Sequence, residues 1–352
     1  MESPRVGDGR LKPTLAVLAI ADDLTGALEA GAKFAGSGIP SLVTIHTVQD
    51  SCHLVAVVDT ESRHLPPGEA AAAVAHAASL PARILYKKTD STLRGNIGAE
   101  LRALLAMRPE AHIVYIPAYP ALGRTVREGR LSIEGVPVHE SAFARDALNP
   151  IADSSIARLL GERLPCTIHD GETDGDVRRA TAEALDRAGP TILAGPASVA
   201  AALAEVLEVP RQPVPPWPRV ARCLIVNGSR HEASVRQIAY AAADGLARWE
   251  IFGMAIPAGL TPPEAADARG HAAARRMESG AFDALMVFGG DTAFAILKAL
   301  GNPPLEPVGE VVTGVPVSRV VGRNLTWIAK AGGFGSESLI ESVWNTLHGH
   351  QR

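Results

Sequence analysis

Charged and hydroxyl side chains gather in three short stretches, each placed directly after an apolar run that predicts a β-strand. The stretches supply Asp22 and Asp23, then Lys88, Asp90, Ser91 and Arg94, and finally Arg124 and Thr125. Open parallel sheets bind ligands beyond the carboxyl ends of their strands, so these side chains are expected to share one site. Arginine and lysine hold carboxylates, and aspartate accepts hydrogen bonds from hydroxyls. The mixture favours a small, polyhydroxylated acid as ligand.

A plainer interpretation exists for each of these residues. Asp23 and Ser91 could cap helices, while Lys88 and Arg94 could form ion pairs at the surface. A cap needs only one residue, however, whereas "ADD" and "KTDSTLRG" each bring several charged or hydroxyl groups. The combination therefore favours a binding site over single structural roles.

The second half of the chain carries glycine-bearing turns after its apolar runs. They lie in "VNGSRH", "FGGDT" and "KAGGFGS", and the candidate residues are Ser229, Gly289, Gly290, Asp291, Thr292, Gly332 and Gly333. Paired glycines allow a ligand to approach the backbone, and a following helix offers free N–H groups to phosphate. The alternative for "FGGDT" is a tight turn with Asp291 as helix cap. No turn matches the P-loop, and none matches GxGxxG well, which disfavours a two-domain dehydrogenase.

Apolar runs alternate with helical patterns along most of the chain, which predicts an α/β protein with mainly parallel sheets flanked by helices. The segment 210–218 contains five prolines and is the best candidate for a linker. We therefore expect two α/β domains, an acid-binding domain over residues 1–212 and a nucleotide-binding domain over 219–352. The active site is expected in the cleft between them. Residues 120–150 show no clear periodicity and are expected to form a long functional loop.

Composition narrows the functional classes. The 352 residues are 47% hydrophobic and 20% charged, with a formal net charge of −4. This balance suggests neither a nucleic-acid nor a membrane partner. Three scattered cysteines fit a reducing compartment, and a cytoplasmic location is expected. A homodimer is left open, and no residue is assigned as a metal ligand.

Several motifs resemble one known family, the four-carbon acid sugar kinases. They are "ADDLTGA", "KKTDSTLRGNIGAEL", "PAYPALGRTVREGRL", "NGSRH", "GGDTA", "GEVVTGVPVSR" and "KAGGFGS", which together extend from residue 21 to residue 336. The resemblance implies two α/β domains and ATP-dependent phosphorylation of threonate, erythronate or an oxo-tetronate. It implies nucleotide contacts at Ser229, at Gly289 to Thr292 and at Gly332. It also implies substrate contacts around the acidic and basic residues of the first half.

The expected reaction is attack of a sugar-acid hydroxyl on the γ-phosphate of ATP, with Mg²⁺ bridging the phosphates. Asp22 or Asp23 would accept the hydroxyl proton, and Asp23 is the weaker choice if it caps a helix. Lys88 or Arg94 would hold the substrate carboxylate or the transferred phosphoryl group. The segment 232–288 is shorter than expected of the family. This departure leaves a non-catalytic sensor of sugar acids or nucleotides as the alternative function.

Overall fold

The computed structural model describes residues 15–47, 53–146, 148–161, 164–243, 249–254, 259–280, 282–331 and 333–348. The chain begins with β1 (Leu15–Ala21), α1 (Leu24–Gly36), β2 (Ser41–Ile45), β3 (Val55–Asp59), α2 (Pro67–Ala77), β4 (Ala82–Lys88), α3 (Ile97–Met107) and β5 (His112–Tyr115). It continues with η1 (Pro120–Leu122), β6 (Arg124–Arg127), β7 (Arg130–Ile133), β8 (Val136–Pro137), η2 (Val138–Glu140), η3 (Ala142–Arg145), α4 (Ile156–Leu160), β9 (Cys166–Ile168), α5 (Asp174–Leu185), β10 (Thr191–Gly195) and α6 (Ala197–Val206). The second half contains β11 (Cys223–Asn227), α7 (Glu232–Ala243), β12 (Trp249–Ile251), α8 (Pro262–Glu278), β13 (Ala284–Phe288), α9 (Gly290–Ala299), β14 (Leu305–Val312), β15 (Val315–Val320), β16 (Thr326–Lys330) and α10 (Leu339–His348).

The described strands form one long sheet and one small sheet. The long sheet has 13 strands in the order β12-β11-β13-β16-β15-β14-β2-β3-β1-β4-β10-β5-β9. Its strands are parallel except around the β14–β15 hairpin, which pairs antiparallel with β16 on one side and with β2 on the other. The predicted fold class, an α/β protein with mainly parallel strands flanked by helices, is confirmed. The sequence pattern did not predict that the hairpin joins the two parallel regions edge to edge.

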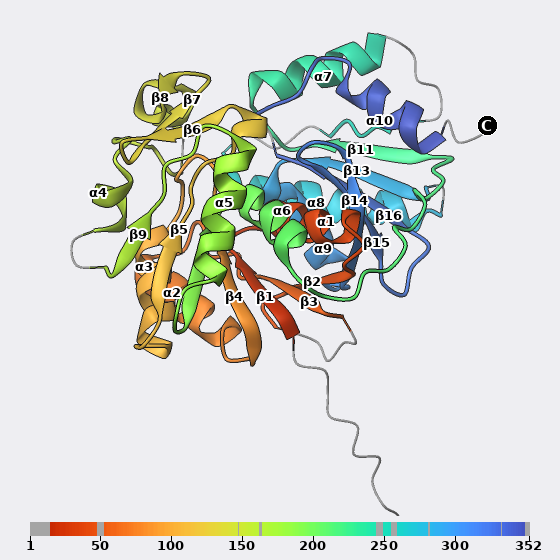
Figure 1. Ribbon diagram of the computed structural model, residues 1–352. Coiled ribbons are helices and arrows are strands. Elements are labelled where there is room, and N and C mark those ends of the chain that lie inside the picture. Colours follow the sequence, from red (N-terminus) through yellow and green to blue (C-terminus); the bar gives the residue numbers. More distant parts are fainter. Residues whose placement is uncertain are drawn as a thin grey trace, which may run out of the picture.

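Helix α1 lies at the centre of the molecule and contacts both halves (Figure 1). It begins after the N-cap Asp23 and ends at Gly36, just before Gly38 with its φ of +78°. Ten of its 13 residues are buried. It packs against β2 and β3 of the first half and against β14 and α9 of the second. Burial on nearly all sides explains the alanines and glycines of this helix, because small side chains permit close packing.

The segment 120–150 is not the irregular loop that its sequence suggested. It contains η1, the three-stranded antiparallel sheet β6-β7-β8, and two further short 3₁₀ helices. Both hairpin turns have positive φ at their two central residues, Glu128–Gly129 and Glu134–Gly135. Such turns match the twist of paired strands. The strands have only two to four residues, too few for a periodic pattern to stand out.

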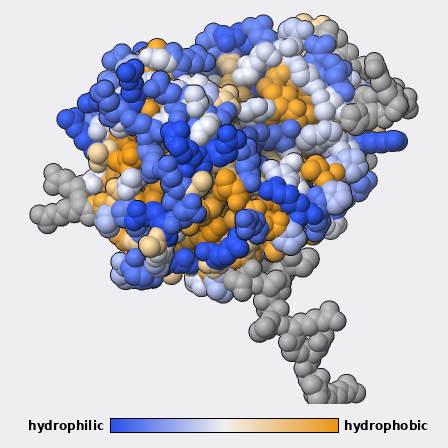
Figure 2. Space-filling model, viewed as in Figure 1, coloured by the Kyte–Doolittle hydropathy of each residue, from blue (hydrophilic) through white to orange (hydrophobic). Residues whose placement is uncertain are grey.

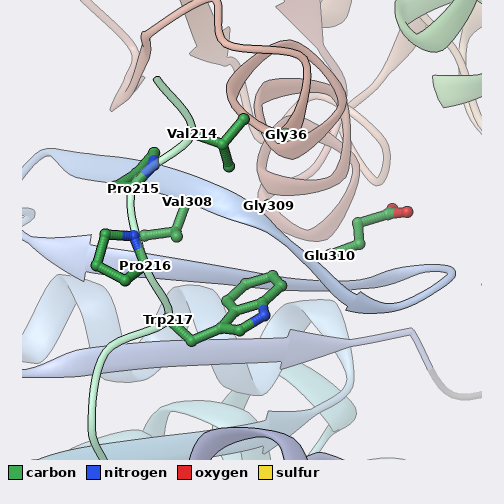
Figure 3. A pocket seen from close by; sticks show the side chains of 8 residues that line it. All are labelled: Gly36, Val214, Pro215, Pro216, Trp217, Val308, Gly309 and Glu310. Carbon is green, nitrogen blue, oxygen red and sulfur yellow. The ribbon is translucent and has the colours of Figure 1, made fainter. Parts of the chain in front are cut away.

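The proline-rich segment 210–218 lies outside helices and strands and runs along the C-terminal end of α1. The Gln212 amide donates to the Gly38 carbonyl at 2.7 Å. A cavity of about 300 Å³ lies here between Trp217, Gly36 and Glu310 (Figure 3). Helix α1 is roughly 20 Å long at 1.5 Å per residue. The cavity is therefore far from the acidic residues at the other end of α1.

The molecular surface in view is mainly hydrophilic, with apolar areas near α10 and around β1 and α6 (Figure 2). Exposed apolar side chains of this kind are common on soluble proteins. Within the described ranges, no helix has both the length and the apolar character that crossing a bilayer requires.

Candidate active site

Three carboxylates converge on one buried guanidinium. Arg63 Nε lies 2.7 Å from Asp22 Oδ2, its Nη1 lies 2.7 Å from Asp23 Oδ2, and its Nη2 lies 3.5 Å from Asp90 Oδ1. Asp22 and Asp23 follow β1, Arg63 follows β3, and Asp90 follows β4. The strands β3, β1 and β4 are parallel neighbours, so their carboxyl ends meet at one edge of the sheet. We call these four residues the acid cluster.

The helix-cap interpretation is correct for Asp23 and wrong for Ser91. Asp23 Oδ1 accepts the Gly26 amide at 3.0 Å, and its Oδ2 accepts the Thr25 hydroxyl at 2.9 Å. Ser91 lies in the turn after β4, whereas α3 begins later, after Asn96. Asp23 thus combines a cap with an ion pair to Arg63. Asp22 has no such capping role.

Opposite charges offset the burial of the cluster's carboxylates. Burial by itself would raise the pKa of Asp22, but Arg63, Lys87 and Lys88 outweigh burial and lower that pKa. At Asp90, burial is likewise outweighed by Arg94 and Arg63, so its pKa lies well below its usual value. Both groups are therefore carboxylates at neutral pH.

Asp22 keeps one oxygen available. Its Oδ2 binds Arg63, while Oδ1 is buried and has no hydrogen-bond partner among the described residues. Buried polar atoms are nearly always satisfied, so an orphaned carboxylate oxygen points to an external donor. A substrate hydroxyl is one such donor.

The predicted cations lie around the cluster rather than on the surface. Arg94 binds Asp90 at 2.8 Å and Asp146 at 3.2 Å, with its guanidinium 5.5 Å from the centre of the Phe143 ring. Lys88 is buried, and its Nζ occupies the space that a side chain at Gly26 would need. Lys88 and Arg94 are thus held within the site.

The third predicted stretch places a buried arginine at the start of β6. Arg124 is 6% exposed and donates to the Leu122 carbonyl, and its Nε has no partner among the residues described. Two backbone hydrogen bonds with Tyr119 fix its position, and Thr125 follows it in the strand. The orphaned Nε makes Arg124 suited to an anionic ligand.

The loop that follows β3 was missed at the sequence level. It carries Glu61, Ser62, Arg63 and His64, and Glu61 adopts a φ of +47°. Glu61 Oε1 accepts the Leu24 amide at 3.1 Å and so binds the first turn of α1. The signal was present in the sequence, because "TESRH" follows an apolar strand just as "ADD" follows β1.

The glycine turn of "FGGDT" opens α9. Gly289, with a φ of +100°, is the N-cap residue and supplies no side-chain cap. Asp291 is therefore not the helix cap; it lies in the first turn, exposed. Thr292 is buried against Gly228, where any side chain would collide with it. The helix terminus thus presents glycine backbone instead of a capping side chain.

The other two glycine turns lie beside this one. The Gly228 amide donates to the Phe288 carbonyl at 2.9 Å, and the Gly289 amide donates to the Lys330 carbonyl at 3.0 Å. Ser229 follows Gly228 and accepts the His231 amide at 3.1 Å. Gly333 lies near the His231 and Phe143 rings, while Gly332 lies outside the described residues. Lys330, also missed at the sequence level, ends β16, and burial lowers its pKa to about 7.

The acid cluster and the α9 terminus are in contact. A Cβ built on Gly290 would lie 2.9 Å from Thr25 Oγ1 and 3.2 Å from Asp23 Oδ2. His64 Nε2 lies 3.3 Å from Asp291 Oδ1, and this interaction lowers the pKa of Asp291. The charged groups of the first half and the glycine turn of the second half therefore form one region.

Two family models match the chain. A sugar-binding N-terminal domain matches residues 17–244, and a nucleotide-binding C-terminal domain matches residues 263–340. The chain belongs to the four-carbon acid sugar kinase family. The D-threonate kinase of Salmonella typhimurium is 29% identical over 92% of this chain and 96% of its own length. The 3-oxo-tetronate kinase of Methylobacterium radiotolerans is 28% identical, over 92% of this chain and 97% of its own.

Solved structures share the fold. A Salmonella typhimurium protein, provisionally named a tRNA synthase, superposes with a TM-score of 0.76 at 21% identity, covering 93% of this chain and 98% of its own. A Haemophilus influenzae protein superposes with a TM-score of 0.70 at 18% identity, covering 94% of this chain and all of its own. At these identities the likeness concerns the fold alone.

Proposed function

We propose that this protein is an ATP-dependent kinase that phosphorylates a hydroxyl of a four-carbon acid sugar, such as threonate, erythronate or an oxo-tetronate. One observation carries the proposal most directly. The orphaned Asp22 Oδ1 belongs to a cluster that touches Gly290, at the uncapped N-terminus of α9. A proton acceptor for the sugar hydroxyl thus lies next to a backbone suited to phosphate. The names of the kinase relatives, which align over more than nine-tenths of the chain, support the same activity.

We assign the acid sugar to the first half of the chain. Lys88, Arg94 and Arg124 would bind the carboxylate or the transferred phosphoryl group, because their positive charges surround the cluster. The candidates for hydroxyl recognition are Asp90, Ser91 and Thr125. Asp22 would orient the attacking hydroxyl and accept its proton, since Asp23 is already engaged as a helix cap.

We assign the ATP phosphates to the second half. The turn from Gly289 to Thr292 would bind them through backbone N–H groups, with Ser229, Gly332 and Gly333 alongside. Among the residues described, no group of three or more His, Cys, Asp or Glu is arranged to hold a metal ion. Magnesium in kinases is bound largely by phosphates and water, with one or two carboxylates. We therefore expect Mg²⁺ to arrive with ATP, and Asp291 is the exposed carboxylate at the helix terminus.

We further propose that residues 1–212 and 219–352 act as the acid-binding and nucleotide-binding domains. The coil between α6 and β11 separates them. In this division the active site lies where the loops after β1, β3 and β4 face the N-terminus of α9. Excluding water there would favour transfer to the sugar over hydrolysis of ATP.

A panel of four-carbon acids tests the activity. ADP release should be observed with at least one of threonate, erythronate and the oxo-tetronates. With that acid and saturating ATP, Asp22→Asn should lower kcat by about 10²–10⁴-fold, the usual effect of losing a general base. The control is Asp186→Asn, which removes an exposed carboxylate at the C-terminal end of α5.

Two results would contradict the assignment. An Asp22→Asn enzyme within about threefold of the wild type would remove Asp22 as the base. A protein that binds an acid or nucleotide in thermal-shift assays but releases no ADP would favour the sensor function instead. The segment 232–288, which is shorter than expected of the family, would then be the first candidate for the cause of the lost turnover.

A further inference from the structure

Arg63 is the element of the acid cluster that no sequence motif singled out. Its side chain is 9% exposed and contacts Asp22, Asp23 and Asp90, which come from two different strand ends. Each of its three guanidinium nitrogens faces a different carboxylate. A planar fork with fixed donor directions is the one cationic side chain that can do this.

The backbone around Arg63 is held by a separate set of buried contacts. The Ser62 hydroxyl donates to Glu100 at 2.5 Å, and Glu100 pairs with the buried Lys87 at 3.1 Å. The Asn96 amide group donates to the carbonyls of Ser62 and Leu65 at 3.0 and 2.9 Å. The guanidinium therefore extends from a fixed loop. A side chain that positions other groups must itself be held in place.

Without Arg63, the ionised forms of the three carboxyl groups would repel one another, and their pKa values would rise. Like charges in a buried site disfavour ionisation, and burial acts in the same direction. Asp22 would still face Lys87 and Lys88, but the carboxylates of Asp23 and Asp90, which Arg63 also binds, would lose this shared cation. The buried Asp59, which has no arginine partner among the interactions described, has a pKa raised to about 7, mainly by burial.

We propose that Arg63 is the positioning residue of the phosphoryl-acceptor site: by binding Oδ2 of Asp22 it keeps this group a carboxylate and directs Oδ1 toward the substrate hydroxyl. This inference rests on the proposed kinase function. In the step it serves, the hydroxyl O–H bond breaks as a new O–P bond forms to the γ-phosphorus of ATP. The proton goes to Asp22 Oδ1, and the bond between the γ-phosphorus and the leaving oxygen of ADP breaks. Arg63 exchanges no atom and acts through Asp22.

The test is the pH dependence of kcat/KM for Arg63→Lys and Arg63→Ala. The acid limb of this profile reports the free base, so Arg63→Ala, which removes the charge, should lose activity at a higher pH than the wild type, by about one unit or more. Arg63→Lys keeps the charge and should retain an acid limb close to that of the wild type. At pH 8, kcat of both variants should fall by roughly 10- to 100-fold because Asp22 is no longer oriented, with KM for ATP nearly unchanged. Adding guanidinium ion should restore part of the activity of Arg63→Ala.

Arg102→Ala is the matched control for losing an arginine near the first-half core. Its guanidinium donates to the Leu160 carbonyl at 2.7 Å and contacts none of the cluster. It should keep the wild-type profile and show no response to guanidinium. If Arg63→Ala does not fold, the lysine variant alone decides, because it preserves the charge and loses the fork.

The outcomes separate the two proposals. A wild-type protein without kinase activity would overturn both. An active wild type whose Arg63→Lys variant keeps the wild-type kcat at pH 8, or whose Arg63→Ala variant keeps the wild-type acid limb, would overturn the role of Arg63 alone. An increase in KM for ATP as the main effect would also overturn it, because Arg63 would then act on the nucleotide.

Discussion

At the scale of single residues, Asp59 illustrates how burial without an ion-pair partner raises the pKa of a carboxyl group. It ends β3, it is fully buried, and its Oδ2 has no partner among the residues described. Burial raises its pKa to about 7, and the nearby Asp22 and Asp23 add to the effect. In the unfolded chain the same group ionises near its ordinary, lower pKa. The folded protein therefore holds a proton here that the unfolded chain releases.

This difference gives a signed prediction for stability. Between about pH 4 and pH 7 the folded state binds the extra proton, so the contribution of Asp59 to wild-type stability should fall as the pH rises through this window. Asp59→Asn cannot titrate and should lose none of this stability. The free energy of unfolding of the variant minus that of the wild type should rise by on the order of 1–4 kcal/mol between pH 4 and pH 8. Urea unfolding across this range measures it.

Asp174→Asn is the control for removing one carboxylate, because Asp174 is exposed in the first turn of α5. Glu61 hydrogen-bonds to Asp59, and its pKa is also raised, mainly by burial and by Asp59, so the difference reports the titration of the Asp59–Glu61 pair. Glu310 also has a pKa raised to about 7, mainly by burial, but it is present in every protein compared. A difference between Asp59→Asn and the wild type that stays constant with pH would show that Asp59 is ionised in the fold.

The sequence predicted many site residues because strand ends in a parallel sheet share an edge. This logic located Asp22 and Asp90, which belong to the acid cluster, and Arg94, which binds Asp90. It applied equally to the end of β3, yet Arg63 and His64 were overlooked among ordinary loop residues. Hydrogen-bond geometry could not be read from the sequence at all. The orphaned oxygen of Asp22, for example, depends on distances set by the whole sheet.

At the scale of elements, the position of α9 depends on its close contact with α8. Gly270 lies in α8, and a Cβ built on it would lie 2.6 Å from the backbone and side chain of Ala295. Gly270→Ala should therefore push the helices apart and cost about 1–3 kcal/mol of stability. Because Gly290 begins α9, a displacement of α9 should also weaken ATP binding and raise KM for ATP. Thermal unfolding and initial rates at varied ATP measure the two effects.

Gly68→Ala is the matched substitution, because a Cβ at Gly68 in α2 would meet nothing within 4 Å. It should leave stability unchanged or raise it by about 0.5–1 kcal/mol, since alanine favours helices. If Gly270→Ala is as stable as Gly68→Ala, the α8–α9 contact must be looser than the structure indicates.

Most strands of five or more residues could be predicted from the sequence, whereas several shorter strands could not. The strands β1, β4, β11 and β13 each coincide with an apolar run of the sequence, because strands of five to seven mostly buried residues are conspicuous. The strands β6 to β8 are too short for this signal. The place of the β14–β15 hairpin in the sheet is hard to predict for another reason, because it joins β16 to β2, which lies far away in the sequence. Its role depends on tertiary pairing that no local pattern encodes.

At the scale of the whole molecule, the two halves are joined by more than the chain between them. Strand β14 pairs with β2 at Leu305 and Val43, and α1 packs on β14. Lys33 of α1 also binds Glu310 at 2.5 Å, with both side chains largely buried. The linker 210–218 adds contacts at the end of α1, but it is only one of several connections. Association of the halves should therefore survive a break in the linker.

A protease site inserted at Val214, whose side chain is exposed, tests this expectation. After cutting, the two fragments should elute together in size-exclusion chromatography and retain kinase activity, because the hairpin and α1 still hold them. Glu310→Lys places two cations together and should weaken the association of the cut fragments by at least about 100-fold, as breaking a buried pair costs about 3–5 kcal/mol. The uncut protein with the same insertion controls for the insertion itself. Separation of the cut fragments without the Glu310 substitution would mean that the linker, rather than the shared sheet, holds the halves together.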